Sequence, residues 1–196
     1  PDENAYVIGF TTNHASPFAQ RWGGWYVTGT QGIVHMGNVP VMPQDKGRLP
    51  LSNPNDLPSL EGLFDLRGYA SPYSDAAALL VLDHQTYMVN EITRVGWEAR
   101  LAEATPSDDA ASRVKEAAQD LVDYMLFVTE EPLPHPVHTA SGFAEKFSAQ
   151  GPRDRKGRSL HQLDLQHRLL RYPCSYMIYS DAFDALPPMA KDAVYA

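Results

Sequence analysis

The stretch SDAAALLVLDHQTYMVNEITRVGWEARLAE, residues 74–103, decides the fold. Ser74 and Asp75 are residues that cap helices, and an uninterrupted apolar run over 76–82 follows them. Three further apolar side chains recur at helical spacing: Val89, Ile92 and Val95. The pattern therefore predicts one long helix that ends before Pro106.

A second helix is predicted directly after the first. Thr105-Pro106-Ser107-Asp108 offers a capping residue, a proline and an acidic residue, which are typical of a helix start. An apolar stripe follows, made of Ala111, Val114, Ala118, Leu121, Met125 and Val128. Because the connection is short, we expect the two helices to form an antiparallel hairpin.

The rest of the C-terminal half predicts short helices joined by loops. We expect helices over 141–150 and 159–171, with a basic turn at 151–158 between them. Another helix is predicted from Pro173, with apolar residues on two faces, so that it should be deeply buried until Pro187-Pro188 ends it.

Residues 1–73 differ in composition from the remainder, because they are rich in glycine, proline, asparagine and aromatic residues. Tyr6–Thr11 is a candidate strand, and the turn residues 28–32 predict a hairpin between Trp25–Thr28 and Ile33–Met36. Five prolines in Pro40–Pro58 indicate a surface loop.

The expected fold class is therefore mainly α. An irregular, glycine- and aromatic-rich N-terminal region, residues 1–73, contains a short β-hairpin and wraps around a helical domain, residues 74–196. We expect both parts to form one compact unit, since 196 residues suit a single domain.

Composition excludes several classes of protein. The net charge of −8 argues against nonspecific nucleic-acid binding and against docking on anionic lipid. A single cysteine, Cys174, rules out an internal disulfide and a C-x-x-C-H haem-attachment motif within this chain. The sequence contains no run of about 18 apolar residues, so it predicts no membrane-spanning helix. Because the sequence starts at Pro1 without methionine, we expect a removed signal peptide or an upstream segment.

The segment Arg21–Asn38 contains the first candidates for chemistry. It places five glycines beside Trp22 and Trp25, which indicates special backbone geometry or close approach to another group. The adjacent pair His35-Met36 offers two kinds of axial haem ligand. The alternative is a turn histidine that bonds to the backbone, and the same two interpretations apply to His14.

His84 lies in the long predicted helix, with Met88 and Glu91 at i+4 and i+7 on the same face. An imidazole, a thioether and a carboxylate would then converge on a cofactor or metal. The alternative is a buried histidine with one hydrogen-bonding neighbour and a methionine that fills the core.

Three other features are weaker. His135 and His138 in a proline-rich loop offer a metal two imidazoles, although a solvated loop explains them as well. The run 153–158 is the one basic cluster, and arginine forks there match oxyanions, although such turns are usually solvated. Cys174 is expected to act as a small buried apolar side chain.

Several motifs together resemble one protein family. They are RWGGWYVTG at 21–29, HMGN at 35–38, LDHQ with MVN over 82–90, GPRD with GRSL over 151–160, and RYPCSYMIYS with FDALP over 171–187. The chain resembles the C-terminal portion of bacterial c-type cytochrome-like proteins, in which a C-x-x-C-H segment lies upstream. The resemblance covers residues 14–187.

The resemblance implies an exported, periplasmic protein that holds haem and takes part in electron transport with a redox partner protein or larger complex. It assigns His35, Met36 and His84 as candidate haem ligands or neighbours. The haem-attachment motif would come from a missing upstream segment. Gln31 stands where we expect relatives to carry histidine, so a ligand at that position would be lost.

Three functional hypotheses follow. In the first, a haem-associated electron carrier uses Trp22, Trp25 and Met88 as cofactor contacts, with His35 and His84 as metal ligands. In the second, a cofactor-free structural subunit docks on a redox or photosynthetic assembly. The third is a hydrolase with a metal held by His84 and Glu91, which lacks a third ligand at suitable spacing. We expect a carrier or an accessory subunit rather than an enzyme.

Overall fold

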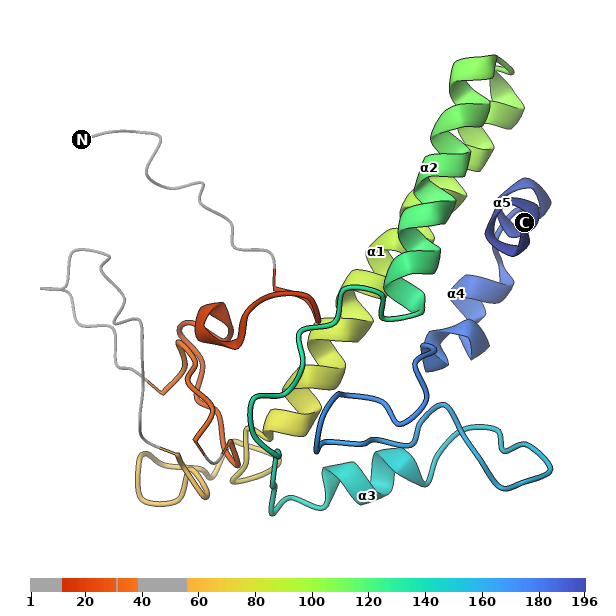
Figure 1. Cartoon of the computed structure of the whole chain (residues 1–196). Helices are drawn as coiled ribbons and strands as arrows, with labels where there is room; N and C mark the ends of the chain where they lie inside the picture. The colour runs from red at the N-terminus through yellow and green to blue at the C-terminus, as the bar shows by residue number, and fades with distance from the viewer. Residues whose placement is uncertain (1–11, 31, 39–55) are drawn as a thin grey trace, which may run out of the picture.

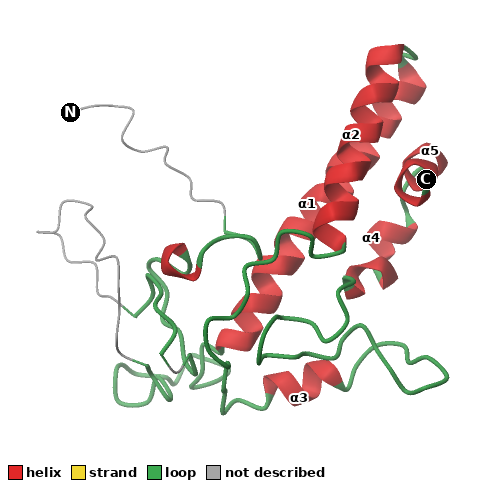
Figure 2. Cartoon of the chain, in the orientation of Figure 1, coloured by secondary structure: helices red, strands yellow, loops and turns green. Residues whose placement is uncertain are grey.

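The computed structural model describes residues 12–30, 32–38 and 56–196, and in this part of the chain helices are joined by turns and loops (Figure 2). The elements in order are η2 (Phe18–Gln20), α1 (Ala76–Ala104), α2 (Asp108–Met125), α3 (Phe143–Ser148), η4 (Tyr176–Tyr179), α4 (Asp181–Asp184) and α5 (Pro188–Tyr195). The expected mainly helical class is confirmed.

The helix hairpin is confirmed. Helices α1 and α2 run antiparallel and side by side over the length of α2, as Figure 1 shows. The Asp75 carboxylate caps α1 by accepting hydrogen bonds from the backbone N–H groups of Ala77 and Ala78. The Ser107 hydroxyl caps α2 by accepting from Ala110. Asp75 belongs to the capping pair expected from the sequence, whereas α2 begins two residues later than the expected start with Thr105 before Pro106.

The buried face of α2 ends earlier than the apolar pattern predicts. Val128 is 64% exposed, because α2 stops at Met125 and the chain then reverses. Phe127 adopts a left-handed conformation with φ of 59°, and the Val128 N–H bonds back to the Asp123 carbonyl at 3.0 Å. This turn sends the Phe127 ring inward, where it is buried.

The predicted β-hairpin in the N-terminal region is wrong, since no sheet forms in the described part of the chain. The backbone of Thr28 instead pairs with the start of α1: its N–H bonds to the Ser74 carbonyl and its carbonyl accepts from Ala76 N–H. The Met36 N–H bonds to the Arg21 carbonyl. Because these backbone groups have partners elsewhere, the two expected strands form no ladder.

The helix expected over 159–171 is also absent. The Asp164 carboxylate accepts the backbone N–H groups of Gln166 and His167, which holds a turn, and Leu165 has a positive φ of 59°. An isolated antiparallel bridge links Leu163 and Leu170. Local hydrogen bonding by Asp164 therefore outweighs the helical spacing of the apolar residues.

The last predicted helix is divided into short pieces. Ser180 takes an extended conformation and caps α4, which separates η4 from α4. Tyr179 is half exposed, so the segment is not deeply buried on both faces. Pro188 then starts α5 rather than ending a helix, since proline suits the first helical position. The short helix predicted over 141–150 is confirmed as α3.

The described part of the N-terminal region lies against the first half of α1, away from the tip of the hairpin (Figure 1). Two expectations, the strand Tyr6–Thr11 and most of the loop Pro40–Pro58, lie outside the described residues. The division of the chain at residue 73 stays a prediction. Within the described ranges, every helix is too short or too polar to cross a lipid bilayer.

Candidate functional site

The segment Arg21–Asn38 has the unusual backbone that its glycines predict. Five of its described residues have positive φ angles: Trp22, Gly24, Gly29, Gly32 and Asn38. A Cβ atom on Gly29 would collide with the carbonyl oxygen of His138. Asn38 links the end of the segment to Val27. Its side-chain oxygen accepts the Val27 N–H at 2.6 Å, and its side-chain NH2 group donates to the Val27 carbonyl at 2.9 Å.

His35 holds this segment together from inside. Its Nδ1 atom accepts the Gly37 N–H at 3.0 Å, so in the neutral imidazole the proton lies on Nε2. That nitrogen is 3.3 Å from the Thr30 hydroxyl, which in turn donates to Asp56 at 3.0 Å. Burial lowers the pKa of His35. These contacts agree with the interpretation of His35 as a turn histidine that bonds to the backbone.

The glycine after Met36 is required by close packing. A Cβ atom on Gly37 would lie 2.8 Å from Val27 and 2.9 Å from the His35 ring nitrogen. Both distances are shorter than ordinary contacts, so a side chain there would displace the imidazole or the valine. The motif HMGN therefore folds this loop back on itself.

An open pocket of about 380 Å³ lies between this segment and α1, and we call it the aromatic pocket. Its walls include Trp22, Trp25 and Met36 from the N-terminal segment. One face of α1 closes it with Leu79, Leu82, Asp83 and Thr86. The volume falls in the range of about 300–1,000 Å³ that is typical of small-molecule sites.

Asp83 gives the aromatic pocket its charge. Its carboxylate accepts the Trp22 indole N–H at 3.0 Å and lies 4.0 Å from the guanidinium of Arg21. Burial raises the pKa of Asp83 to about 6, against the opposing effects of Arg21 and the indole N–H. The buried guanidinium of Arg21 is also bonded to the carbonyls of Ser16 and His14.

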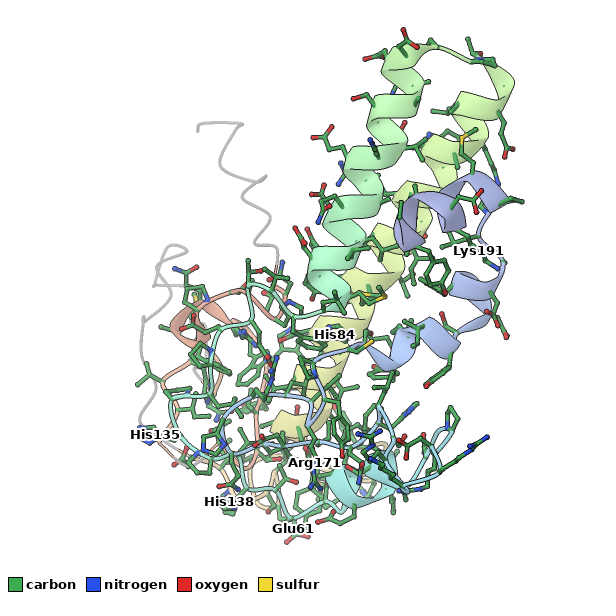
Figure 3. The ribbon with its side chains drawn as sticks, turned by 45° about the vertical axis from the view of Figure 1, so that its right-hand side comes forward. Glu61, His84, His135, His138, Arg171 and Lys191 are labelled. Carbon is green, nitrogen blue, oxygen red and sulfur yellow. The ribbon has the colours of Figure 1, made fainter. Side chains whose placement is uncertain are left out.

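A second site lies on another face of α1, and we call it the histidine cluster. It consists of His14, His84, Tyr124, Phe127 and Ser175, all buried. The Nδ1 atoms of His14 and His84 are 3.0 Å apart, and His84 Nε2 is 2.7 Å from the Ser175 hydroxyl. Figure 3 shows His84 in the part of α1 around which the loops gather.

The rings of the histidine cluster are stacked. The imidazoles of His14 and His84 are inclined by 11° to each other, and both stack on Tyr124 and on Phe127. The closest pair is His14 and Tyr124, with centroids 3.8 Å apart. Such stacking fixes the ring planes, so the hydrogen bond between the imidazoles is held in one orientation.

Both imidazoles of the cluster are neutral. Burial, together with the neighbouring His14, lowers the pKa of His84 to about 3. Burial and the charge of Arg21 lower the pKa of His14 to about 3 as well. One neutral ring can therefore donate to the other, as the 3.0 Å distance between the two Nδ1 atoms requires.

The cluster combines a serine with two histidines, yet it does not form a hydrolytic site. Ser175 has no exposed surface, so a substrate cannot reach its hydroxyl. That oxygen also accepts the Met177 N–H and thereby caps η4. A cavity of about 10 Å³ lies beside His14, which is room for one water molecule.

One ring nitrogen of the cluster stands out. Within the described part of the chain, His14 Nε2 is buried and has no hydrogen-bond partner. The small cavity beside it is also lined by Arg21, Glu130 and Glu131. A bridging water there would satisfy this nitrogen.

Three of the six residues predicted to contact a cofactor line the aromatic pocket: Trp22, Trp25 and Met36. His35 and His84 have different hydrogen-bond partners and are not joined in one ligand set. Met88 is fully buried in the core.

The predicted convergence of His84 with Glu91 is not seen. Glu91 lies 3.5 Å from Arg94 and next to Tyr87, whereas His84 bonds to His14 and Ser175. No group of three or more metal-binding side chains occurs in residues 12–30, 32–38 and 56–196.

The remaining candidates lie elsewhere. His135 and His138 are exposed, and Figure 3 shows them at the end of the molecule that is opposite the hairpin tip. Cys174 is half-buried, and burial raises the pKa of its thiol, which leaves it protonated and weakly nucleophilic at neutral pH.

Sequence reasoning missed most of the histidine cluster and the charge of the aromatic pocket. His14 was noted without a partner, and Tyr124, Phe127, Ser175 and Asp83 were given no role. One signal was present: Asp83 and His84 are adjacent polar residues inside an apolar helical run. Such residues need partners when they are buried.

The donor set fits a haem group only in part. An axial imidazole must offer iron a ring nitrogen that no hydrogen bond occupies, and both nitrogens of His35 and of His84 have partners. The cavity beside His14 has no room for a porphyrin. Met36 and the two tryptophans do line an open pocket, so the thioether is the predicted ligand whose surroundings suit haem.

Comparisons of the chain with protein-family models, with curated proteins and with solved structures found no match. The resemblance to c-type cytochrome-like proteins therefore stays a prediction that rests on the sequence motifs.

Proposed function

We propose that this chain is the haem-contacting part of an exported electron-transfer protein, and that it meets the haem at the aromatic pocket. The observation that carries the proposal is the shared location of Trp22, Trp25 and Met36. The motifs that resemble cytochrome-like proteins supply these three residues, and the fold places them around one opening.

The chemistry of the pocket suits a large, flat, mostly apolar group. Indole rings offer broad apolar faces, and a thioether is a soft ligand that would raise the potential of a haem iron. When bound, the haem would supply the one-electron chemistry. The chain would contribute contacts, exclude water and hold Asp83 close to the cofactor.

In this proposal the imidazoles have a structural role. His35 closes the loop that carries Met36, and His84 anchors the loops packed on α1. A histidine ligand for the iron would come from the upstream segment that the resemblance implies.

An absorption spectrum tests the proposal. Purified chain, alone and joined to any upstream segment that its gene encodes, is titrated with haemin. We expect a shifted Soret band with one haem per chain, and substitution Met36→Leu should weaken binding or lower the reduction potential. The matched control is Met189→Leu, a partly exposed methionine on α5 that does not line the pocket.

Two results would contradict the proposal. If both samples show the spectrum of bare protein after titration, the chain does not contact haem. Loss of binding in folded His84→Gln or His35→Gln, with Met36→Leu unaffected, would move the haem to the imidazoles.

A second function is favoured by a separate observation, a group of aromatic rings formed by the exposed Tyr26 and Tyr69 and the partly buried Phe64. Neighbouring rings in this set have centroids 5.5 Å apart, and Tyr69 is 64% exposed. Exposed apolar groups of this kind mark protein interfaces. They support the alternative of a cofactor-free subunit that docks on a larger redox assembly, which a bare spectrum would favour.

A further inference from the structure

The basic loop after α3 forms a pocket that the proposed function does not use. This loop extends outward from the helices (Figure 1). Residues 153–158 contain four cationic side chains and one acidic side chain, in a protein whose net charge is −8. The pocket has a volume of about 390 Å³, and its lining includes Arg153, Asp154, Arg158, Tyr172 and Tyr179.

The loop is held in one shape by its own side chains. The Asp154 carboxylate accepts the backbone N–H groups of Lys156 and Arg158, at 2.9 and 2.8 Å. It also forms an ion pair with the Arg158 guanidinium at 2.6 Å. These backbone and side-chain bonds lower the pKa of Asp154, so the carboxylate stays charged and keeps its position.

Arg153 ties the same loop to α3. Its guanidinium donates to the Gly157 carbonyl at 2.9 Å and to the Ser148 carbonyl at 3.2 Å. Gly157 has a positive φ of 75°, which lets the loop turn back toward Arg153.

The bracing leaves donors for a ligand. A guanidinium carries five N–H groups, and these contacts engage two of them on Arg153 and two on Arg158. The charge of Arg158 is offset by Asp154, whereas Arg153 is held by carbonyl oxygens, which carry no net charge. Arg153 therefore provides the pocket with a positive charge that is already in position, which favours an anion.

Aromatic side chains form the other wall. Tyr172 lies near two cations, because the guanidinium carbons of Arg158 and Arg171 are each 5.9 Å from its ring centroid. Tyr179 on η4 is half exposed and completes this wall. Figure 3 shows Arg171 in the region where the loops meet α3. Tyrosine rings beside guanidinium groups suit a ligand that carries both an aromatic ring and an oxyanion.

We propose that this pocket binds a small aromatic compound that carries a phosphate or carboxylate group. The ring packs against Tyr172 and Tyr179, and the oxyanion accepts hydrogen bonds from Arg153 and Arg158. The proposal is independent of haem binding, because the aromatic pocket and this pocket share no residue.

Calorimetric titration of the full chain with phenyl phosphate, benzoate and inorganic phosphate tests the proposal. We expect phenyl phosphate or benzoate to bind with a Kd below about 1 mM, and inorganic phosphate about tenfold more weakly. The tighter of the two aromatic probes identifies the oxyanion. Added salt should weaken binding, since the attraction is electrostatic.

Three variants separate the contributions. Arg153→Gln should weaken aromatic anions about tenfold, while Arg153→Lys keeps the charge and a part of the affinity. Tyr179→Ala should weaken the aromatic probes and leave inorganic phosphate unchanged, and it does not touch the loop bracing. Arg67→Gln removes a charge from an exposed residue outside the pocket and should change nothing.

The proposal is overturned by absence of saturable binding of either aromatic probe up to about 10 mM. It is also overturned when Tyr179→Ala and folded Arg153→Gln bind the aromatic probes as tightly as the unmodified chain does. Binding of inorganic phosphate as tight as that of phenyl phosphate would overturn it as well.

Discussion

The aromatic pocket and the histidine cluster lie on two faces of one helix and differ in almost every property. Asp83 and His84 are neighbours in sequence, yet successive residues point about 100° apart around a helix axis. Asp83 therefore faces an open pocket with a charged carboxylate, and His84 faces a closed cluster of rings.

The difference between the two sites indicates that the aromatic pocket suits ligand binding, whereas the histidine cluster stabilises the fold. The open side has room but no imidazole, and the closed side has two imidazoles but room for a single water. Burial of polar groups costs free energy unless they are hydrogen-bonded, so the bonds of His84 to His14 and Ser175 hold loops onto α1. The pocket, in contrast, leaves side-chain surface for another molecule.

Removal of His84 should have the largest effect. We expect His84→Ala to lower the free energy of unfolding by about 3–5 kcal/mol, because it leaves a cavity and removes the partner of both His14 and Ser175. Urea denaturation measures the change. The control His167→Ala removes a side chain that is 87% exposed and should stay within about 0.5 kcal/mol of the unmodified chain. Equal effects of the two substitutions would mean that the cluster does not stabilise the fold.

Acid should affect the two sites in opposite directions. The folded chain binds protons on His14 and His84 only near pH 3, whereas the unfolded chain binds them below 6.5. As the pH falls from 6.5 toward 3, each imidazole therefore lowers the free energy of unfolding. His35 has a lowered pKa and acts in the same direction.

Asp83 opposes this loss. Its pKa is about 6 in the folded chain against an ordinary 3.8, so the folded state takes up its proton first and gains stability as the pH falls from 6 to 4. As the pH falls, we expect the free energy of unfolding of Asp83→Asn to decrease more steeply than that of the unmodified chain. Urea denaturation at about pH 6.5 and about pH 5 measures the slope. A shallower acid dependence in Asp83→Asn would contradict the assignment of opposite signs.

A methyl group inside the HMGN loop should disturb the wall of the pocket. Gly37→Ala places a Cβ 2.8 Å from Val27, and we expect it to cost about 2 kcal/mol and to displace the His35 ring. Gly68→Ala is the matched control, because a Cβ there meets nothing within 4 Å. Thermal unfolding compares the two variants, and equal melting temperatures would show that the loop has space to relax.

The smallest effect is expected from the tryptophans, which compare the buried and exposed walls of the pocket. Trp22→Phe removes the indole N–H that bonds to Asp83 and should cost about 1–2 kcal/mol, and it should raise the pKa of Asp83 further. Trp25 is 55% exposed, so Trp25→Phe should leave stability unchanged within about 0.5 kcal/mol. NMR titration of the carboxylates measures the pKa of Asp83. An unchanged pKa in Trp22→Phe would show that the indole hydrogen bond does not influence it.

The sequence predicted the parts whose signals are local. Helix periodicity, the capping residue Asp75 and the helix-start residues 105–108 identified the hairpin, and the glycines identified the loop with positive φ angles. It failed where a side chain competes with the helix for backbone groups, as Asp164 does in the predicted helix 159–171.

The candidate sites divide in the same way. The motifs RWGGW and HMGN gave three residues of the aromatic pocket, since these are close in sequence. The histidine cluster joins residues 14, 84, 124, 127 and 175, and no local pattern relates positions so far apart.

The sequence by itself determined the helical class, the α1–α2 hairpin and the irregular backbone of the Arg21–Asn38 loop, because capping, periodicity and glycine conformation act over a few residues. Only the tertiary structure decided which histidines meet, and that Asp83 and His84 serve different sites. Those outcomes depend on long-range packing around α1, where burial sets both the partners and the charge of each polar group.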